Sequence, residues 1–165
     1  MRLTLRILSL LLVLSVTGTA LGASQRKVPA YEKYIKQYSS LAIQHQKKYR
    51  IPASITLAQG LLESGAGRSE LARKSNNHFG IKCHSDWRGG RVYHDDDLRG
   101  ECFRKYKNPE QSYEDHARFL VDRPRYASLF KLKITDYKGW ARGLQKCGYA
   151  TDRAYANRLI KIGRA

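Results

Sequence analysis

Between Ser54 and Lys82 the chain reads SITLAQGLLESGAGRSELARKSNNHFGIK. Apolar residues recur there at helical spacing, Pro52 stands where a first-turn proline is tolerated, and Gly65 is a typical helix stop. Glu63 therefore falls in the last turn of a mostly apolar helix, although a solvent-facing helix end is the plainer alternative. Helix-end carbonyls and neighbouring leucines disfavour a carboxylate, so we expect the pKa of Glu63 to exceed its usual value of about 4.3. A carboxyl group that is protonated near neutral pH suits a general acid.

Three ordered motifs surround this glutamate: LAQGLLESGAGRSELA at 57–72, SNNHFGIK at 75–82 and GYATD at 148–152. Together they resemble the glucosaminidases of glycoside hydrolase family 73, over roughly residues 31–162. The resemblance implies a mainly α, lysozyme-like helical domain with a small β-hairpin lobe. It also implies a peptidoglycan hydrolase, since that is the activity of the family, which includes the muramidase-like domain of flagellar rod-assembly hydrolases.

The N-terminal residues 1–23 have the pattern of a signal peptide, with two arginines, an apolar run from Ile7 to Val16 and small residues up to Ala23. The apolar run is shorter than the ~20 residues that span a bilayer, so a retained anchor is the weaker alternative. We expect a glucosaminidase domain at 24–165 that is periplasmic or secreted after cleavage. No stable membrane association is expected once the signal peptide is removed.

The charge of the chain is strongly basic. Its 165 residues include 31 Lys and Arg against 14 Asp and Glu, a formal net charge of +17 at pH 7. Such a charge favours binding to a polyanion. The basic residues are scattered rather than gathered into an arm, and export argues against nucleic acid. We therefore expect peptidoglycan glycan strands, which carry acidic stem peptides, as the partner of a monomeric protein.

The chain contains three cysteines, Cys83, Cys102 and Cys147. Cys83 and Cys102 flank a short segment with a turn-like middle, so we expect them to form a disulfide in an oxidising compartment and Cys147 to be free. Their spacing does not resemble a zinc site. We expect no structural metal and no cofactor.

Helical periodicity and capping residues predict further helices along the chain. The first, at 31–49, places several tyrosines on one face, where core packing is favoured over a role as sugar platforms. Trp140 is likewise expected in the core. The other segments are 69–74, 108–123, 137–147 and a last helix from Thr151 or Asp152 through Ile162, with 125–130 as a short helix or turn.

Residues 87–106 predict two short strands joined by a turn at 98–100. In the family a glutamate on this hairpin is the second acid, whereas this chain has a shorter segment with Asp95, Asp96, Asp97 and Glu101. Strand alternation places Asp96 on the face of Val92 and His94, so Asp96 is the first candidate for the second catalytic acid. Asp95, Asp97 and Glu101 are further candidates that could contact substrate. The alternative is an Asp-rich turn that binds a stray cation or nothing.

The resemblance also implies roles for residues in the other two motifs. The SNNHFG segment lies along the substrate cleft in the family, so Asn77 and Phe79 are candidates for sugar contacts, although Asn is also a common turn residue. Tyr149 matches a family tyrosine near the acid and is a candidate for substrate positioning or transition-state stabilisation. Its alternative role is to pack two helices together.

The resulting hypothesis is an exported hydrolase that cleaves the β-1,4 bond between N-acetylglucosamine and N-acetylmuramic acid, with Glu63 as general acid. The second step stays open: a hairpin aspartate could activate water with inversion, or the substrate's N-acetyl group could attack. One alternative is a lytic transglycosylase or muramidase of the same fold. Another is a non-catalytic cell-wall-binding or assembly protein, and a nucleic-acid-binding protein is the least favoured.

Overall fold

The computed structural model describes residues 28–96 and 98–164 of the chain. The expected signal peptide and Asp97 lie outside the described residues. Within the described ranges, every helix is too short or too polar to cross a lipid bilayer.

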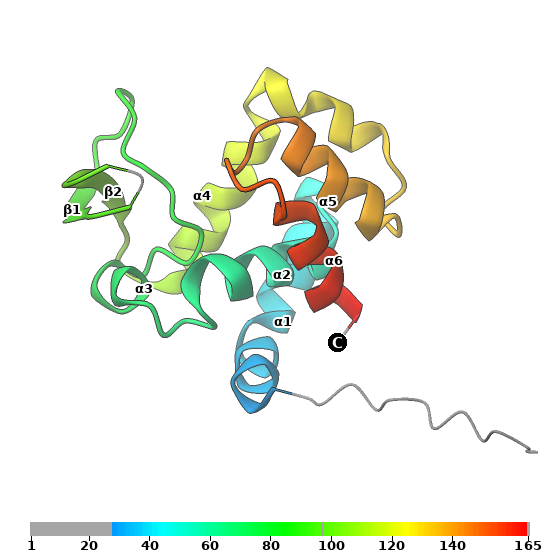
Figure 1. Cartoon of the computed structure of the whole chain (residues 1–165), viewed down its shortest axis with the longest axis horizontal. Helices are drawn as coiled ribbons and strands as arrows, with labels where there is room; N and C mark the ends of the chain where they lie inside the picture. Colours follow the sequence, from blue (N-terminus) through cyan, green and yellow to red (C-terminus); the bar gives the residue numbers. More distant parts are fainter. Residues whose placement is uncertain (1–27, 97, 165) are drawn as a thin grey trace, which may run out of the picture.

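The described residues form a mainly α-helical fold with one two-stranded antiparallel sheet, which confirms the expected fold class. In Figure 1 the hairpin stands at one edge of the molecule, apart from α5 and α6, while α2 runs through the middle. The elements are α1 (Pro29–Tyr49), α2 (Ala53–Ser64), α3 (Glu70–Ser75), β1 (Gly90–His94), β2 (Glu101–Lys105), α4 (Pro109–Val121), the 3₁₀ helix η1 (Pro124–Lys131), α5 (Tyr137–Lys146) and α6 (Tyr155–Arg164).

Helix α2 is the central element of the helical body. Helices α1, α5 and α6 all pack against it, and its buried residues include polar ones such as Gln59 as well as the apolar Ile55 and Leu61. A Cβ atom at Gly60 would overlap the hydroxyl group of Tyr34, so glycine is what allows α1 to approach this closely. This packing fixes the position of the C-terminal turn of α2.

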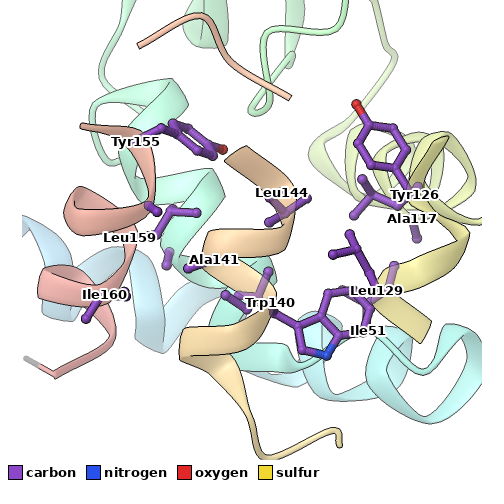
Figure 2. Packing of buried hydrophobic residues seen from close by; sticks show 14 residues of the cluster. Ile51, Ala117, Tyr126, Leu129, Trp140, Ala141, Leu144, Tyr155, Leu159 and Ile160 are labelled. Carbon is purple, nitrogen blue, oxygen red and sulfur yellow. The ribbon is translucent and has the colours of Figure 1, made fainter. Parts of the chain in front are cut away.

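The larger hydrophobic core joins α2 and α4 to the C-terminal elements, and Figure 2 shows its side chains. Trp140 is 1% exposed there, as predicted. Tyr126 and Tyr155 lie at one end of this cluster and Trp140 at the other. The core thus holds two tyrosines at the end where the catalytic groups are expected.

A second core packs α1 against α2, α4 and the loop after α3. Tyr34 and Tyr113 are fully buried in it, which agrees with the predicted packing role of the first-helix tyrosines. Their hydroxyl groups are satisfied: that of Tyr113 donates to that of Tyr34 (2.8 Å), which lies 2.9 Å from Nδ1 of His78. Ile35 was predicted on the packed face but is 38% exposed.

The hairpin pairs Val92 with Phe103 and His94 with Glu101. Val92 and His94 are half-buried, whereas Tyr93 between them is 66% exposed, as the predicted alternation requires. The structure joins Cys83 to Cys102 in a disulfide, as predicted. This bond and the backbone hydrogen bond from Cys83 to Cys102 (2.8 Å) tie the preceding loop to β2.

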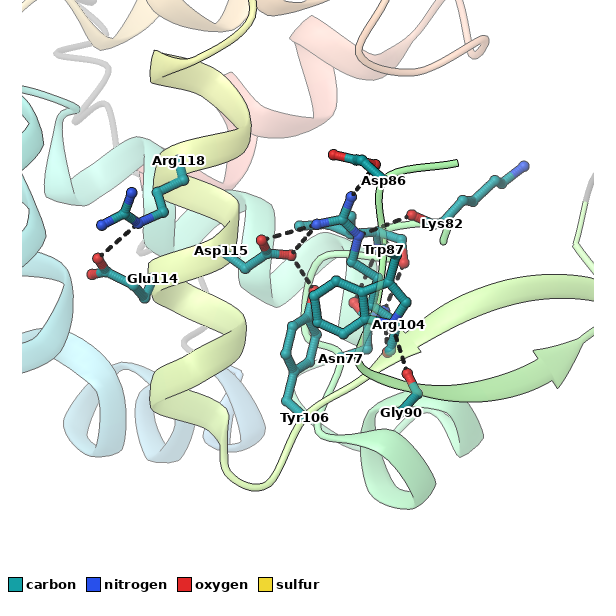
Figure 3. A network of polar contacts seen from close by, with 11 residues as sticks. Asn77, Lys82, Asp86, Trp87, Gly90, Arg104, Tyr106, Glu114, Asp115 and Arg118 are labelled. Carbon is teal, nitrogen blue, oxygen red and sulfur yellow. Dashed lines mark hydrogen bonds and ion pairs between the residues drawn. The ribbon is translucent and has the colours of Figure 1, made fainter. Parts of the chain in front are cut away.

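A buried arginine fastens the hairpin to the helical body (Figure 3). Arg104 on β2 is 5% exposed and donates to both carboxylate oxygens of Asp115 on α4, at 3.0 and 3.1 Å. Its Nε atom donates to the backbone carbonyl of Lys82 (3.2 Å), and its guanidinium lies 4.7 Å from the centre of the Trp87 ring. The Nη1 atom of Arg104 thus contacts both oxygens of Asp115, and this charge-assisted contact ties the hairpin to α4.

The final helix begins later than predicted. It was expected to start at Thr151 or Asp152, but α6 starts at Tyr155. The side chain of Asp152 accepts a hydrogen bond from the backbone of Ala154 (2.8 Å), two residues on, and therefore closes a turn rather than capping a helix. Residues 149–152 consequently remain in a loop, from which they line the cleft described below.

Candidate active site

A cleft of about 490 Å³ lies between the hairpin and the helical body. Its walls come from the end of α2, the loop after α3, the inner face of the hairpin, the corner between α4 and η1, and the loop before α6. Three of the predicted site residues that line it, Glu63, Asp96 and Tyr149, come from three different elements.

Glu63 lies in the last turn of α2, just before Gly65 ends the helix in the left-handed conformation (φ 55°). Its pKa is raised to about 7, mainly by burial, and the negative charge of Asp96 adds to the rise. A hydrogen bond from Tyr155 and the positive charge of Arg158 act in the opposite direction. The rise in pKa therefore has the direction expected from the sequence, and it favours a protonated carboxyl group at higher pH than for an exposed glutamate.

A buried chain of hydrogen bonds holds Glu63 from behind. The hydroxyl group of Tyr155 donates to Oε1 of Glu63 (2.9 Å), and Nε2 of Gln59 donates to that hydroxyl oxygen (2.9 Å). Oε1 of Gln59 in turn accepts from Nε2 of His116 (3.1 Å). Because the Gln59 carbonyl oxygen can only accept, Nε2 of His116 is the donor, and the chain ends with Oε1 of Glu63 as an acceptor.

The two inner members of this chain are fully buried. Gln59 and His116 are each 0% exposed, and burial lowers the pKa of His116 to about 3, so its ring is neutral. The sequence prediction did not include Gln59, His116 or Tyr155. Gln59 precedes Glu63 by four residues, so helical spacing could have placed it on the same face.

Asp96 is the hairpin acid that lines the cleft together with Glu63, and its charge acts on the pKa of Glu63. It follows β1 on the face of His94, which also lines the cleft. Its side chain lies 3.7 Å from Nζ of Lys82, and Lys82 also pairs with Glu101 at 2.8 Å. Glu63, Asp96 and Asp152 are the acidic residues among the described residues that line the cleft, and glycoside hydrolysis commonly uses two carboxyl groups.

The other hairpin acids are placed differently. Asp95 accepts from the backbone of Gly100 (2.7 Å) and Glu101 accepts from that of Leu98 (3.0 Å), so both side chains hold the turn. Neither is among the described residues that line the cleft. Asp97 lies outside the described residues. Within 28–96 and 98–164, no group of three or more His, Cys, Asp and Glu side chains is arranged to hold a metal ion.

Tyr149 and Phe79 both line the cleft. The ring of Tyr149 stacks on that of Tyr155, with centroids 5.7 Å apart and planes 20° apart. Burial, with a smaller effect from Glu63, raises the pKa of Tyr149 well above 10, so its hydroxyl group remains a donor. Phe79 stacks on His116 with centroids 3.9 Å apart and is 2% exposed, so it forms the floor of the cleft.

Asn77 is not brought into the cleft. Its side chain is 1% exposed and donates to the backbone carbonyls of Ile81 (3.0 Å) and Arg104 (2.9 Å). Its Oδ1 atom accepts from the backbone of Ile81 (3.0 Å). The polar atoms that were expected to contact sugar are therefore engaged in holding the loop that carries Phe79.

Comparison with known proteins gives the family of the chain. Residues 39–165 match the glucosaminidase family, described as mannosyl-glycoprotein endo-beta-N-acetylglucosaminidase. The chain is 32% identical over 147 residues to the peptidoglycan hydrolase FlgJ of Vibrio parahaemolyticus, covering 82% of this chain and 47% of that protein. It is 38% identical over 130 residues to the exo-glucosaminidase LytG of Bacillus subtilis, covering 70% and 44%. The chain thus spans about half the length of these relatives.

Solved structures agree with this match. The peptidoglycan hydrolase from Sphingomonas sp. A1 aligns with a TM-score of 0.73 at 33% identity, covering 81% of this chain and 88% of that one. The glycoside hydrolase domain of Salmonella typhimurium FlgJ aligns with a TM-score of 0.66 at 28% identity, covering 81% and 86%. Since the family match extends from residue 39 to residue 165, the chain belongs to the glucosaminidases of glycoside hydrolase family 73.

Proposed function

We propose that the chain is a peptidoglycan hydrolase that cleaves the β-1,4 bond between N-acetylglucosamine and N-acetylmuramic acid. The observation that carries the proposal is the placement of Glu63 at the end of α2 in a cleft of about 490 Å³, where Tyr155 donates to its carboxyl group and burial raises its pKa. Relatives named as peptidoglycan hydrolase and exo-glucosaminidase support the same substrate class.

Glu63 acts as the general acid. Its protonated carboxyl group donates to the glycosidic oxygen as the bond breaks, which is the role that a pKa near the working pH favours. The carboxylate that results keeps the hydrogen bond from Tyr155, and such a bond stabilises the charged form. Tyr155 therefore keeps Glu63 strong enough as an acid while burial keeps it protonated.

Asp96 is the second acid in our proposal. It activates a water molecule on the far face of the sugar, which requires carboxyl groups about 6.5–9.5 Å apart and gives inversion. In the competing route the substrate's N-acetyl group attacks, and Tyr149 with the acidic hairpin stabilises the intermediate. Asp96 is favoured among the hairpin acids because Asp95 and Glu101 are occupied in the turn.

We further propose that residues 1–23 are a cleaved signal peptide and that the mature chain acts as a monomer in the periplasm or outside the cell. The Cys83–Cys102 disulfide supports this location, because such bonds persist in oxidising compartments. Peptidoglycan itself lies outside the cytoplasmic membrane.

Digestion of purified peptidoglycan by the wild-type chain and by Glu63→Gln tests the proposal. We expect muropeptides with reducing-end N-acetylglucosamine from the wild type, identified by mass spectrometry after reduction, and none from the variant. Glu70→Gln is the matched control, because Glu70 is exposed on α3 and paired with Lys74. Anhydro products would instead indicate a transglycosylase, reducing-end N-acetylmuramic acid a muramidase, and binding without turnover a wall-binding protein.

A further inference from the structure

Two arginines and a histidine form a basic corner of the cleft, defined here as His84, Arg123 and Arg125. Arg123 and Arg125 lie at the junction of α4 and η1, and His84 follows the disulfide-bonded Cys83. His84 and Arg125 line the cleft, as does Phe119, the residue on which Arg123 lies. His84 and Arg125 therefore belong to the same cleft as Glu63, and Arg123 adjoins it through its contact with Phe119.

The side chains of the corner are held by aromatic rings. The guanidinium of Arg123 lies 3.8 Å from the centre of the Phe119 ring, and the ring of His84 lies 6.1 Å from the same ring. The guanidinium of Arg125 lies 5.4 Å from the Tyr126 ring and donates to the backbone carbonyl of Gly148 (3.2 Å). Stacked guanidinium groups lose less conformational freedom on binding a ligand, since their planes are already oriented.

The corner is a centre of positive charge within the part of the chain that the structure describes. Neither Arg123 nor Arg125 forms an ion pair there, whereas the cleft residues Lys82 and Asp152 are both paired. The pKa of His84 is lowered, first by burial and then by the charges of Arg123, Arg104 and Lys82, with Asp86 opposing them. An anion that enters this side of the cleft therefore meets the guanidinium of Arg125 in the lining and that of Arg123 on the Phe119 ring, and neither guanidinium is neutralised by an ion pair among the described residues.

We propose that the basic corner binds the carboxylates of the peptidoglycan stem peptide, an inference that rests on the proposed function. The sugar backbone of peptidoglycan is uncharged where its lactyl groups carry peptides, so the peptide supplies the anionic groups of the substrate. Planar guanidinium groups match carboxylates through paired hydrogen bonds. The corner thus favours glycan strands whose stem peptides carry free carboxylates over glycan strands whose peptide carboxylates are amidated.

The test compares native peptidoglycan with the same material after its carboxylates are converted to amides. The wild-type chain should digest the native substrate about fivefold to tenfold faster at low substrate concentration, as expected for a charge-assisted contact at a partly exposed site. In Arg123→Gln this ratio of kcat/KM values should fall to about one. Arg142→Gln, an exposed arginine of α5 outside the cleft lining, carries the same charge change and should retain the wild-type ratio.

The origin of the carboxylate is tested with glycan strands from which an amidase has removed the stem peptides. These strands keep only the lactyl carboxylate, and the wild-type chain should treat them like the amidated substrate. Two results would overturn the inference and leave the proposed function standing. One is that the wild-type chain digests native and amidated peptidoglycan at equal rates, and the other is that Arg123→Gln prefers the native material as strongly as the wild type does. A preference for the denuded strands over the amidated ones, lost in Arg123→Gln, would assign the corner to the lactyl group instead.

If no turnover is seen, the proposed function fails, but a binding measurement still tests the inference about the basic corner. Soluble native and amidated muropeptides are titrated into Glu63→Gln, with and without Arg123→Gln. We expect the native muropeptide to bind about fivefold more tightly, with the difference decreasing as salt is added and disappearing with Arg123→Gln. Equal binding of both muropeptides would overturn the inference.

Discussion

The hydroxyl group of Tyr155 donates a hydrogen bond of 2.9 Å to Oε1 of Glu63, across 92 residues of sequence. This bond lowers the pKa of Glu63, against the larger rise that burial causes. The acid strength of Glu63 therefore results from two opposed effects, and each can be altered by one substitution.

Tyr155→Phe removes the bond and keeps the ring. The pKa of Glu63 should then rise above about 7, so the alkaline limb of the kcat/KM profile moves to higher pH. We expect kcat to fall about tenfold, because the carboxylate that forms loses a charge-assisted hydrogen bond. Tyr93→Phe, on the exposed face of β1, is the matched control. An unmoved alkaline limb would contradict the role given to Tyr155.

Asp96→Asn should move the alkaline limb of the kcat/KM profile to lower pH. Removing a negative charge that raises the pKa of Glu63 lowers that pKa, so activity is lost at lower pH than in the wild type. If Asp96 also activates water, kcat falls by about 10² or more. Asp95→Asn changes a neighbouring acid that lies outside the cleft lining and serves as control. A shifted limb with nearly normal kcat would favour attack by the substrate's N-acetyl group.

Glu63 should also make stability depend on pH. Its folded pKa of about 7 exceeds the unfolded value, so the stabilisation from its proton is complete below about pH 4 and is lost as pH rises through about 7. Glu63→Gln removes this dependence. Relative to the variant, the wild type should lose about 2 to 3 kcal/mol of unfolding free energy between pH 5 and pH 8. Urea unfolding of both proteins at the two pH values measures the difference, and parallel losses would contradict the raised pKa.

The Cys83–Cys102 disulfide should stabilise the fold, since it closes a segment with a sequence separation of 19. Replacing both cysteines by alanine is expected to lower the free energy of unfolding by about 2 to 4 kcal/mol. Cys147→Ala removes the free cysteine and keeps the bridge, so its unfolding should still respond to reductant. An unchanged urea midpoint for the wild type on full reduction would show that the disulfide contributes little.

Local patterns predicted much of the fold and part of the site. The position of Glu63 at a helix end follows from apolar spacing and Gly65, and the exposed Tyr93 between half-buried Val92 and His94 follows from strand alternation. Both are short-range consequences of backbone geometry. The start of α6 was missed because Asp152 can close a turn or cap a helix, and only the hydrogen bond to Ala154 shows which it does.

The hydrogen-bond chain behind Glu63 could not be predicted in this way. Gln59 and Tyr155 are 96 residues apart in sequence, and His116 belongs to a third helix. Their contact arises from the packing of α2 between α4 and α6, for which a single sequence contains no periodic signal. The same limit applies to the basic corner, because Arg123 and His84 meet only through Phe119.

Replacing Asn77 distinguishes a role in holding the loop before β1 from a role in binding sugar. Asn77→Ala removes three buried hydrogen bonds, among them the one that the backbone N–H of Ile81 donates and one that the carbonyl of Arg104 accepts, whereas the carbonyl of Ile81 still accepts from the backbone of Arg104. We expect a loss of about 2 to 4 kcal/mol in unfolding free energy, with KM for peptidoglycan little changed where the protein is folded. Asn157→Ala, at an exposed position of α6, controls for the substitution itself. A tenfold rise in KM with unchanged stability would instead restore the sugar contact expected from the sequence, because a side chain that binds substrate contributes to the complex rather than to the loop.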